Sequence, residues 1–194
     1  MMGNEKKFIF VFTGPDGSGR KTVADAAGLT LGLRKVISYT TRNKRPIEEN
    51  GQDYHFVTDE DFLRGIAQNE FMEHLIIGGY RYGVKRQDIN DAFAASSIYF
   101  IMNRYGTDEI ARQYGEQVVR IFLYADRNTV KQRQQRDGLS QAEIDRHLAR
   151  YDEEMAYGPN CEHQVENIGD LGHTVFHVTN LLESYLDRGL IDKD

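Results

Sequence analysis

A short apolar run that leads into a glycine-rich segment constrains the fold of this chain more than any other feature. Residues 8–12 read FIFVF, a β-branched and aromatic run that is typical of a buried parallel strand. Gly14, Gly17 and Gly19 follow, and an alanine-rich helical pattern begins at Thr22. In a strand–loop–helix of this kind, backbone N–H groups of the loop and the positive end of the helix dipole converge on one point. This stretch therefore predicts a phosphate-binding loop.

The loop departs from the usual spelling G-x-x-x-x-G-K-[ST] at one position. Counting from Gly14 puts Arg20 where the lysine is expected, and Lys21 and Thr22 follow one place late. Either Arg20 replaces the lysine, or the loop has one extra residue and Lys21 and Thr22 keep the standard roles. Because an arginine fork and a compact lysine ammonium bind phosphoryl groups differently, the two registers predict different phosphate sites.

Composition excludes several classes of function. The chain has 194 residues, which is enough for one well-buried core. Its net charge of -6 argues against a general nucleic-acid binder. The single cysteine, Cys161, rules out an internal disulfide and is expected to be a bystander. No apolar stretch is long enough to span a bilayer and no secretory apolar core precedes Phe8, so we expect a cytoplasmic protein that does not bind membranes.

The rest of the chain alternates between strand and helix patterns, which predicts an α/β fold with a P-loop-type parallel sheet flanked by helices. Strands are expected at residues 8–12, 36–37, 98–102, 118–124 and 163–167. Helices are expected at 22–31, from 58 onward, and at 85–95, 105–115, 129–157 and 174–188. The helical stretch 129–157 is interrupted at Asp137-Gly138 and restarts with the capping box Ser140-x-x-Glu143.

Residues 38–96 contain segments that are too polar or too glycine-rich for the core. Residues 38–57 carry the turn signal Asn50-Gly51 between segments suited to pair as a hairpin. Residues 70–84 alternate around glycines and predict one or two further strands of a β-rich flap. The helix from Thr58 is expected to be capped by Thr58 with Asp61 and to bury Phe62, Leu63 and Ile66.

The chain resembles the guanylate kinase family through five motifs in the same order and spacing over residues 7–188. These are the glycine-rich loop, SYTTRNKR, ENGQDYHF, NEFMEH and YRYGV. The resemblance implies one domain, 1–194, with a core of 7–37, 97–128 and 162–194, a monophosphate-binding flap of 38–96 and a helical lid of 129–161. It implies phosphoryl transfer from ATP to GMP, giving ADP and GDP. Mg²⁺ would accompany the ATP, and the protein would be a monomer or homodimer.

The resemblance also implies an acceptor site on the flap. Arginines and phenol hydroxyls suit a doubly charged phosphate, because they form charge-assisted and often bidentate hydrogen bonds. The carboxylate of Glu73 can accept from both N1–H and the exocyclic amine of guanine, and adenine has no such paired donors on that edge. The implied GMP-binding residues are Ser38, Arg42, Arg45, Tyr54, Glu73, Tyr82 and Gly83.

The donor site and the lid follow from the same resemblance. The implied ATP-binding residues are Gly14, Asp16, Gly17, Ser18, Gly19, Arg20, Lys21 and Thr22. The implied catalytic residues are Arg20, Lys21, Arg42, Arg133, Arg136 and Arg146, with Arg150 as a further lid arginine. No residue is assigned as a metal ligand.

Three positions depart from the family pattern. Val84 stands where the family usually has a Ser or Thr that contacts the base, and Ile101 and Asn103 stand where acids are expected near the metal and acceptor. Two alternatives therefore stay open. One is a guanylate-kinase-like nucleotide-binding domain with weakened catalysis, which donor binding and turnover would distinguish. The other is a kinase for another nucleoside monophosphate, which a panel of acceptors would distinguish.

Overall fold

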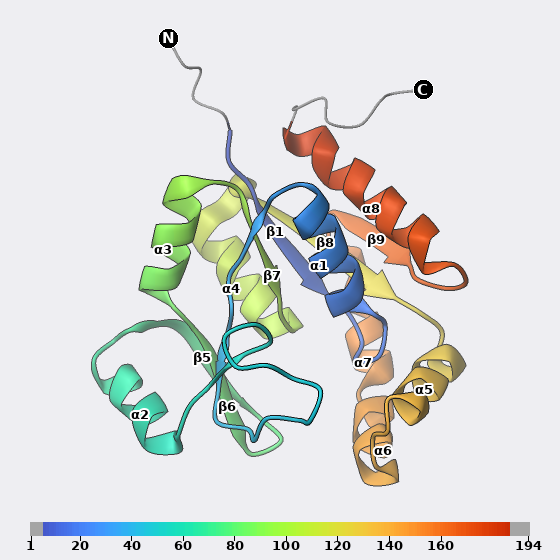
Figure 1. The fold of residues 1–194 in the computed structure, drawn as a ribbon, viewed down its shortest axis with the longest axis horizontal. Helices are drawn as coiled ribbons and strands as arrows, with labels where there is room; N and C mark the ends of the chain where they lie inside the picture. Colours follow the sequence, from blue (N-terminus) through green and yellow to red (C-terminus); the bar gives the residue numbers. More distant parts are fainter. Residues whose placement is uncertain (1–5, 187–194) are drawn as a thin grey trace.

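The computed structural model describes residues 6–186, and a five-stranded parallel sheet forms their centre (Figure 1). Its strand order is β2-β7-β1-β8-β9, and every neighbouring pair is parallel. The strands span Ile9–Thr13 (β1), Arg34–Lys35 (β2), Ile98–Ile101 (β7), Val118–Tyr124 (β8) and His163–Glu166 (β9). The predicted α/β class with a parallel sheet flanked by helices is confirmed.

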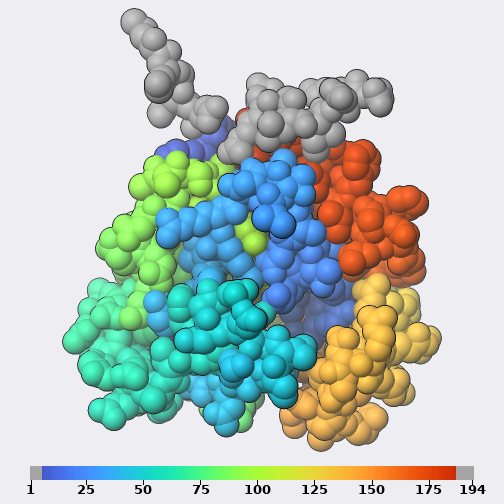
Figure 2. Space-filling view, viewed as in Figure 1, coloured from blue at the N-terminus to red at the C-terminus, as the bar shows by residue number. Residues whose placement is uncertain are grey.

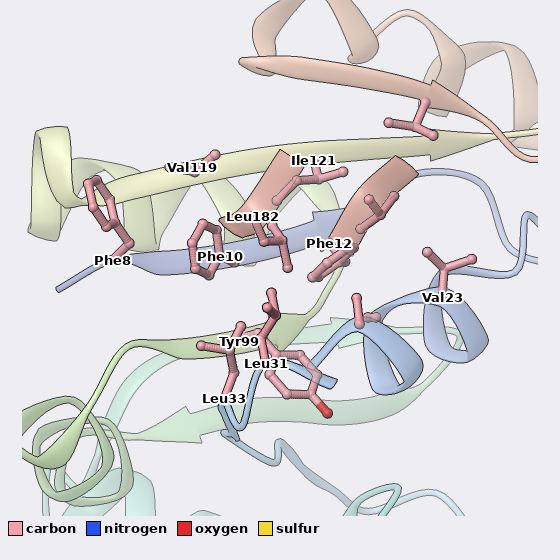
Figure 3. Close-up of a cluster of buried hydrophobic side chains, with 14 of the residues drawn as sticks. Phe8, Phe10, Phe12, Val23, Leu31, Leu33, Tyr99, Val119, Ile121 and Leu182 are labelled. Carbon is pink, nitrogen blue, oxygen red and sulfur yellow. The ribbon is translucent and has the colours of Figure 1, made fainter. Parts of the chain in front are cut away.

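The central strand β1 sends its side chains into two cores, because alternate residues of a strand point to opposite faces. Phe10 and Phe12 lie on the first face, where Val23 and Leu182 pack in the same cluster (Figure 3). The helices that cover this face are α1 (Arg20–Thr30) and α8 (Leu171–Leu186). Burial on both faces explains why this strand reads as a continuous apolar run rather than an alternating one.

The second face of the sheet buries the other residues of β1. Ile9 and Val11 pack there with Ile89 and Ile110. The helices that supply these partners are α3 (Arg86–Ala95) and α4 (Arg104–Tyr114), and a short 3₁₀ turn, η1 (Gly115–Gln117), links α4 to β8. The sheet is therefore covered on both faces, and its loops at the carboxyl ends of the strands are free to form a site.

A second, four-stranded sheet in the order β4-β3-β6-β5 forms the flap. Its elements are β3 (Tyr39–Thr40), β4 (His55–Phe56), α2 (Asp59–Ala67), β5 (Phe71–Ile77) and β6 (Tyr80–Lys85). The one or two strands predicted over 70–84 are two, β5 and β6, and they form a hairpin through Gly78-Gly79, both at positive φ. The expected hairpin over 38–57 is wrong, because β3 and β4 pair in parallel. Gly51 does adopt a turn conformation at φ 81°, but that turn lies inside the longer loop that brings β4 back beside β3.

The helix α2 begins as predicted and buries a narrower face than predicted. The Thr58 side chain accepts a hydrogen bond from the backbone N–H of Asp61 and caps the helix. Phe62 is buried and stacks on Phe71 with ring centroids 4.2 Å apart. Leu63 is exposed, contrary to expectation, because the second buried position of the helix is Gly65, which lets the Phe71 ring approach its backbone.

Three short helices form the lid beside the flap (Figures 1 and 2). They are α5 (Arg127–Arg136), α6 (Gln141–Ala149) and α7 (Tyr151–Met155), followed by the 3₁₀ turn η2 (Gly158–Asn160). The predicted break occurs at Gly138, which has φ 77°. Ser140 and Glu143 form the predicted capping box at the start of α6, with both reciprocal hydrogen bonds present.

The ends of most other elements differ from the predictions by one to three residues, whereas β8 has the predicted bounds 118–124. The helix α1 begins at Arg20 rather than Thr22, because Gly19 adopts φ 88° and ends the loop there. The strand expected at 36–37 lies at Arg34–Lys35. The expected end of the closing helix, Arg188, lies outside the described residues. Within 6–186, no helix has the length and apolarity needed to cross a membrane.

Gly14 offers a test of how closely β8 supports the loop. It sits at φ 134°, and a Cβ there would lie 1.9 Å from the carbonyl oxygen of Leu123. We expect Gly14→Ala to lower the free energy of unfolding by about 2 kcal/mol or more, because a backbone atom cannot move aside as a flexible side chain can. Denaturant unfolding measures this loss.

Gly169→Ala is the matched control for this substitution. Gly169 also has positive φ, at 82°, but nothing lies within 4 Å of a Cβ built there. It therefore carries the conformational strain without the clash. Equal losses in the two variants would contradict the role given to the Leu123 carbonyl.

Candidate active site

A cavity of about 770 Å³ lies where the glycine-rich loop, the flap and the lid meet. Its volume is in the range of ordinary small-molecule sites. The structure brings most of the predicted site residues to its wall. Those that line it are Asp16, Gly17, Arg20, Ser38, Arg42, Arg45, Tyr54, Glu73, Tyr82, Gly83 and Arg146.

Arg20, and not Lys21, extends from the loop into this cavity. The Arg20 guanidinium donates to Asp16 Oδ1 at 2.7 Å and to the Met102 carbonyl at 3.2 Å, and its side chain is only 16% exposed. Lys21 is 59% exposed and pairs with Asp25 and Asp53, each at 3.1 Å. Neither Lys21 nor the exposed Thr22 lines the cavity.

The flap holds Arg42 in one orientation on its side of the cavity. The guanidinium makes a bidentate ion pair with Glu48, with N–O distances of 2.7 and 3.0 Å. It also lies over the Tyr54 ring, 5.5 Å from the centroid. Sequence reasoning missed Glu48, although a glutamate six residues after an arginine in a turn-rich segment is a usable signal for such a pair.

The two predicted tyrosines lie side by side next to Arg42. The ring centroids of Tyr54 and Tyr82 are 5.9 Å apart. Burial, with a contribution from Tyr82, raises the pKa of Tyr54 to about 12. Its hydroxyl therefore stays protonated at neutral pH and can donate a hydrogen bond to an anion.

Glu73 lies on β5 and lines the cavity. Burial, together with the negative charge of Glu109, raises the pKa of its carboxyl to about 7. A carboxyl in such surroundings changes its hydrogen-bonding character near neutral pH, from acceptor only to donor and acceptor. Val84, which pairs with Glu73 across the hairpin, is fully buried among core residues such as Met72 and Ile89 and does not reach the cavity.

The lid arginines fall into two groups. Arg146 and Arg150 line the cavity. Arg133 instead donates to the carbonyls of Ser18 and Asn167, at 3.2 and 2.8 Å, and so fastens α5 to the loop. Arg136 is 78% exposed, and its nearest acid is Asp137 at 3.9 Å. The structure thus places Arg133 and Arg136 outside the cavity wall.

Several polar residues that sequence reasoning missed hold the loop in place. Gln134 is buried and donates to the carbonyl of Asp16 at 2.7 Å. Asn167 is buried and donates to the carbonyl of Ser18 at 2.8 Å. The position of Asn167 was a usable signal, because it directly follows the last strand at the carboxyl edge of the sheet, where sites form.

The order of these groups along the chain is that of one protein family. The family model described as guanylate kinase matches residues 6–185. The chain belongs to the guanylate kinase family. The predicted family is therefore confirmed.

Individual members of the guanylate kinase family match over nearly the whole chain. The guanylate kinase of Chlorobaculum tepidum is 32% identical over 184 residues, which cover 93% of this chain and 94% of the relative. That of Symbiobacterium thermophilum is 27% identical over 208 residues, covering 98% and 99%. The crystal structure of guanylate kinase from Anaplasma phagocytophilum aligns with a TM-score of 0.77 at 25% identity, covering 96% of this chain and 89% of that one.

Guanylate kinases are kinases that use ATP, normally with a divalent metal, but the residues beside this loop do not form a metal site of their own. No group of three or more His, Cys, Asp or Glu side chains within 6–186 could hold a metal ion. The amide oxygen of Asn103 accepts from the backbone N–H groups of Tyr105 and Gly106 and caps α4. The carboxylate of Asp16 is already paired with Arg20 and Arg150, and the positive charge of Lys21 would repel a metal ion rather than bind it.

The two registers of the loop make opposite predictions for polyphosphate binding. We expect Arg20→Met to weaken the binding of inorganic tripolyphosphate at least about tenfold, because it removes a charge-assisted donor from the cavity. Lys21→Met, which removes an exposed charge outside the cavity, should change affinity less than about threefold. Isothermal titration calorimetry measures both. A larger loss in Lys21→Met would mean that Lys21 is the phosphate ligand.

Proposed function

We propose that this chain is a guanylate kinase that transfers the terminal phosphoryl group of ATP to GMP and gives ADP and GDP. One observation carries the proposal. A single cavity joins Arg20 of the loop, Arg42 and Arg45 of the flap and Arg146 of the lid. A kinase needs this convergence, because phosphoryl transfer is catalysed mainly by positioning and by positive charge around the transferred group.

The acceptor phosphate would bind to Arg42, Arg45 and Ser38 and to the hydroxyls of Tyr54 and Tyr82. Arg42 is fixed by Glu48 before any ligand arrives, so less conformational entropy is lost on binding. Arg45 approaches Glu143 of α6 at 3.8 Å and so reaches from the flap to the lid. This contact supports a position for the acceptor phosphate beside the lid rather than deep in the flap.

The base of the acceptor would lie against Glu73. Its ionised carboxylate accepts from two adjacent N–H groups, which guanine presents and adenine does not. Val84 has no hydroxyl and is buried in the core, so it cannot contact the base. Glu73 would therefore carry the discrimination between guanine and adenine on this edge. The cavity wall also includes the apolar side chains of Leu75, Ile101 and Met102, which are suited to contact a purine.

The donor phosphates would bind to the loop N–H groups, Arg20, Arg146 and Arg150. The N-terminal end of α1 adds its dipole at the same point. No side chain has to act as a covalent nucleophile. Mg²⁺ would enter bound to the ATP phosphates and water, since the described residues offer no metal cluster of their own.

The arrangement of the chain supports a division by role. We assign residues 7–37, 97–128 and 162–186 to the core, 38–96 to the flap and 129–161 to the lid, within one domain; the rest of the predicted domain 1–194 lies outside the described residues. A monomer or homodimer and a cytoplasmic location stay predictions from the sequence.

The experiment that tests the proposal is a coupled assay of ADP formation with ATP, Mg²⁺ and GMP, run beside AMP, CMP and dGMP. We expect GMP-dependent turnover that exceeds turnover with the other acceptors. Turnover with a different acceptor would point to another monophosphate kinase. Measurable GMP binding without turnover would leave a binding domain.

The Arg42–Glu48 pair predicts an effect on acceptor affinity. We expect Glu48→Gln to weaken GMP binding about fivefold or more, because the Arg42 guanidinium loses its bidentate partner and its fixed orientation. Titration calorimetry with GMP measures it. Glu49→Gln is the matched control, since Glu49 is the adjacent, exposed acid and contacts Gln52 instead. Equal effects of the two substitutions would show that only the net charge of the flap matters.

The raised pKa of Glu73 predicts a pH dependence of guanine recognition. Because burial raises the pKa of this carboxyl to about 7, it is ionised above that pH and protonated below it. We expect GMP affinity to fall about tenfold between pH 8 and pH 6, beyond the change that the titrating GMP phosphate itself causes. Glu73→Gln, which cannot ionise, isolates the phosphate contribution. Parallel profiles in the two proteins would remove Glu73 from base recognition.

A further inference from the structure

The carboxylate of Asp16 sits in the loop and faces cations from two other parts of the chain. Oδ1 accepts from Arg20 at 2.7 Å. Oδ2 lies 3.4 Å from the Arg150 guanidinium, at the end of α6, and 3.8 Å from Nε2 of His147 on α6. The loop is therefore joined to the α6 part of the lid through one acidic side chain.

The charge balance around Asp16 favours its ionised form. Burial alone would raise the pKa of this carboxyl, but Arg20, His147 and Arg150 together outweigh burial and lower it below its ordinary value. The neighbouring acid Glu154 shows the opposite effect, because burial and the charge of Asp16 raise its pKa to about 7. Asp16 is thus the negative charge around which these cations gather.

The same cations face the cavity in which a polyphosphate would bind. Arg20, His147 and Arg150 all line it. Three residues that line the cavity have a buried polar atom without a hydrogen-bond partner: Gln134 Oε1, His147 Nδ1 and Arg150 Nε. Leaving such atoms unpaired destabilises the protein, so this cluster is suited to meet a further polar group.

A carboxylate oxygen and a phosphate oxygen make the same charge-assisted hydrogen bonds to a guanidinium. The two anions also repel each other at short distance. Asp16 and a donor phosphate therefore compete for Arg20 and Arg150, which cannot form full-strength hydrogen bonds to both anions at once.

We propose that Asp16 is an internal stand-in for a donor phosphate, which holds Arg20, His147 and Arg150 in the ligand-free protein and is displaced by the incoming polyphosphate. In this arrangement the ligand-free lid rests against the loop through Asp16. A bound donor takes over the same cations and completes the contacts of the unpartnered atoms. The proposal rests on donor binding at this loop, which belongs to the proposed function.

The test compares wild type with Asp16→Asn, which keeps the size of the side chain and removes its charge. Titration calorimetry with inorganic tripolyphosphate, without metal, measures competition directly. We expect Asp16→Asn to bind the probe at least about fivefold more tightly than wild type. Affinity that is unchanged or weaker in Asp16→Asn overturns the proposal.

The second readout is the lid itself in the absence of any ligand. Hydrogen exchange of the backbone amides of residues 141–150 should be faster in Asp16→Asn than in wild type, because the contacts to His147 and Arg150 weaken. Unchanged exchange there contradicts the role of Asp16 in holding the lid. This readout needs no turnover, so it stays informative even if the coupled assay with GMP fails.

Two further variants test whether the effects on affinity and on hydrogen exchange are specific to Asp16. Asp137→Asn removes a carboxylate that also lines the cavity but lies near Arg136 rather than Arg20 or Arg150, and it should change neither readout appreciably. A gain in Asp137→Asn equal to that in Asp16→Asn would mean that only net charge matters. Asp16→Ser, a smaller polar replacement, should reproduce the gain in affinity if the Asn variant fails to fold.

Discussion

A loop that binds phosphate through its N–H groups needs its carbonyl oxygens hydrogen-bonded elsewhere, since buried backbone groups must be paired. In this chain, distant residues meet that need. Gln134 donates to the carbonyl of Asp16, while Asn167 and Arg133 donate to that of Ser18. The loop depends on these hydrogen bonds from the lid and from the end of β9. The cavity, in turn, depends on the loop.

The sequence predicted the parts of the structure that short-range chemistry determines. The bounds of β8 agree with the expected 118–124, and the capping box of α6 forms as written in the sequence. Apolar runs, caps and glycine turns act over a few residues, so their effect can be read locally. All seven residues expected to bind the acceptor line the cavity, because the family motifs that name them lie on or beside the four strands of the flap sheet.

What the sequence did not predict depends on contacts between distant segments. The parallel pairing of β3 and β4 is decided by where the flap loop returns, which a local turn signal does not encode. Whether Arg20 or Lys21 faces the cavity depends on Asp53, more than thirty positions along the chain, because that acid holds Lys21 outside. Gln134 and Arg133 sit on a helix surface where most polar residues are solvated, and only the folded loop gives them a partner.

Electrostatics in the cavity follow a consistent pattern despite the negative net charge of the chain. Arg20, Arg42 and Arg45 each lie near a carboxylate, from Asp16, Glu48 and Glu143 respectively. These acids limit the mutual repulsion of arginines crowded into one cavity and fix their orientations. The arginines that would bind anionic substrates are thus paired with carboxylates that lie in or beside the same cavity wall.

Lys21 joins two parts of the site that have to be in register. Its ammonium lies between Asp25 of α1, the helix that begins at the loop, and Asp53, which precedes Tyr54 in the acceptor flap. The loop and the flap, which would bind the donor and the acceptor, are thereby both positioned relative to α1. In-line transfer requires the reacting atoms to meet within about 3–3.5 Å. Lys21, which lies outside the cavity, can thus fix the distance between the loop and the flap across which the two substrates have to meet.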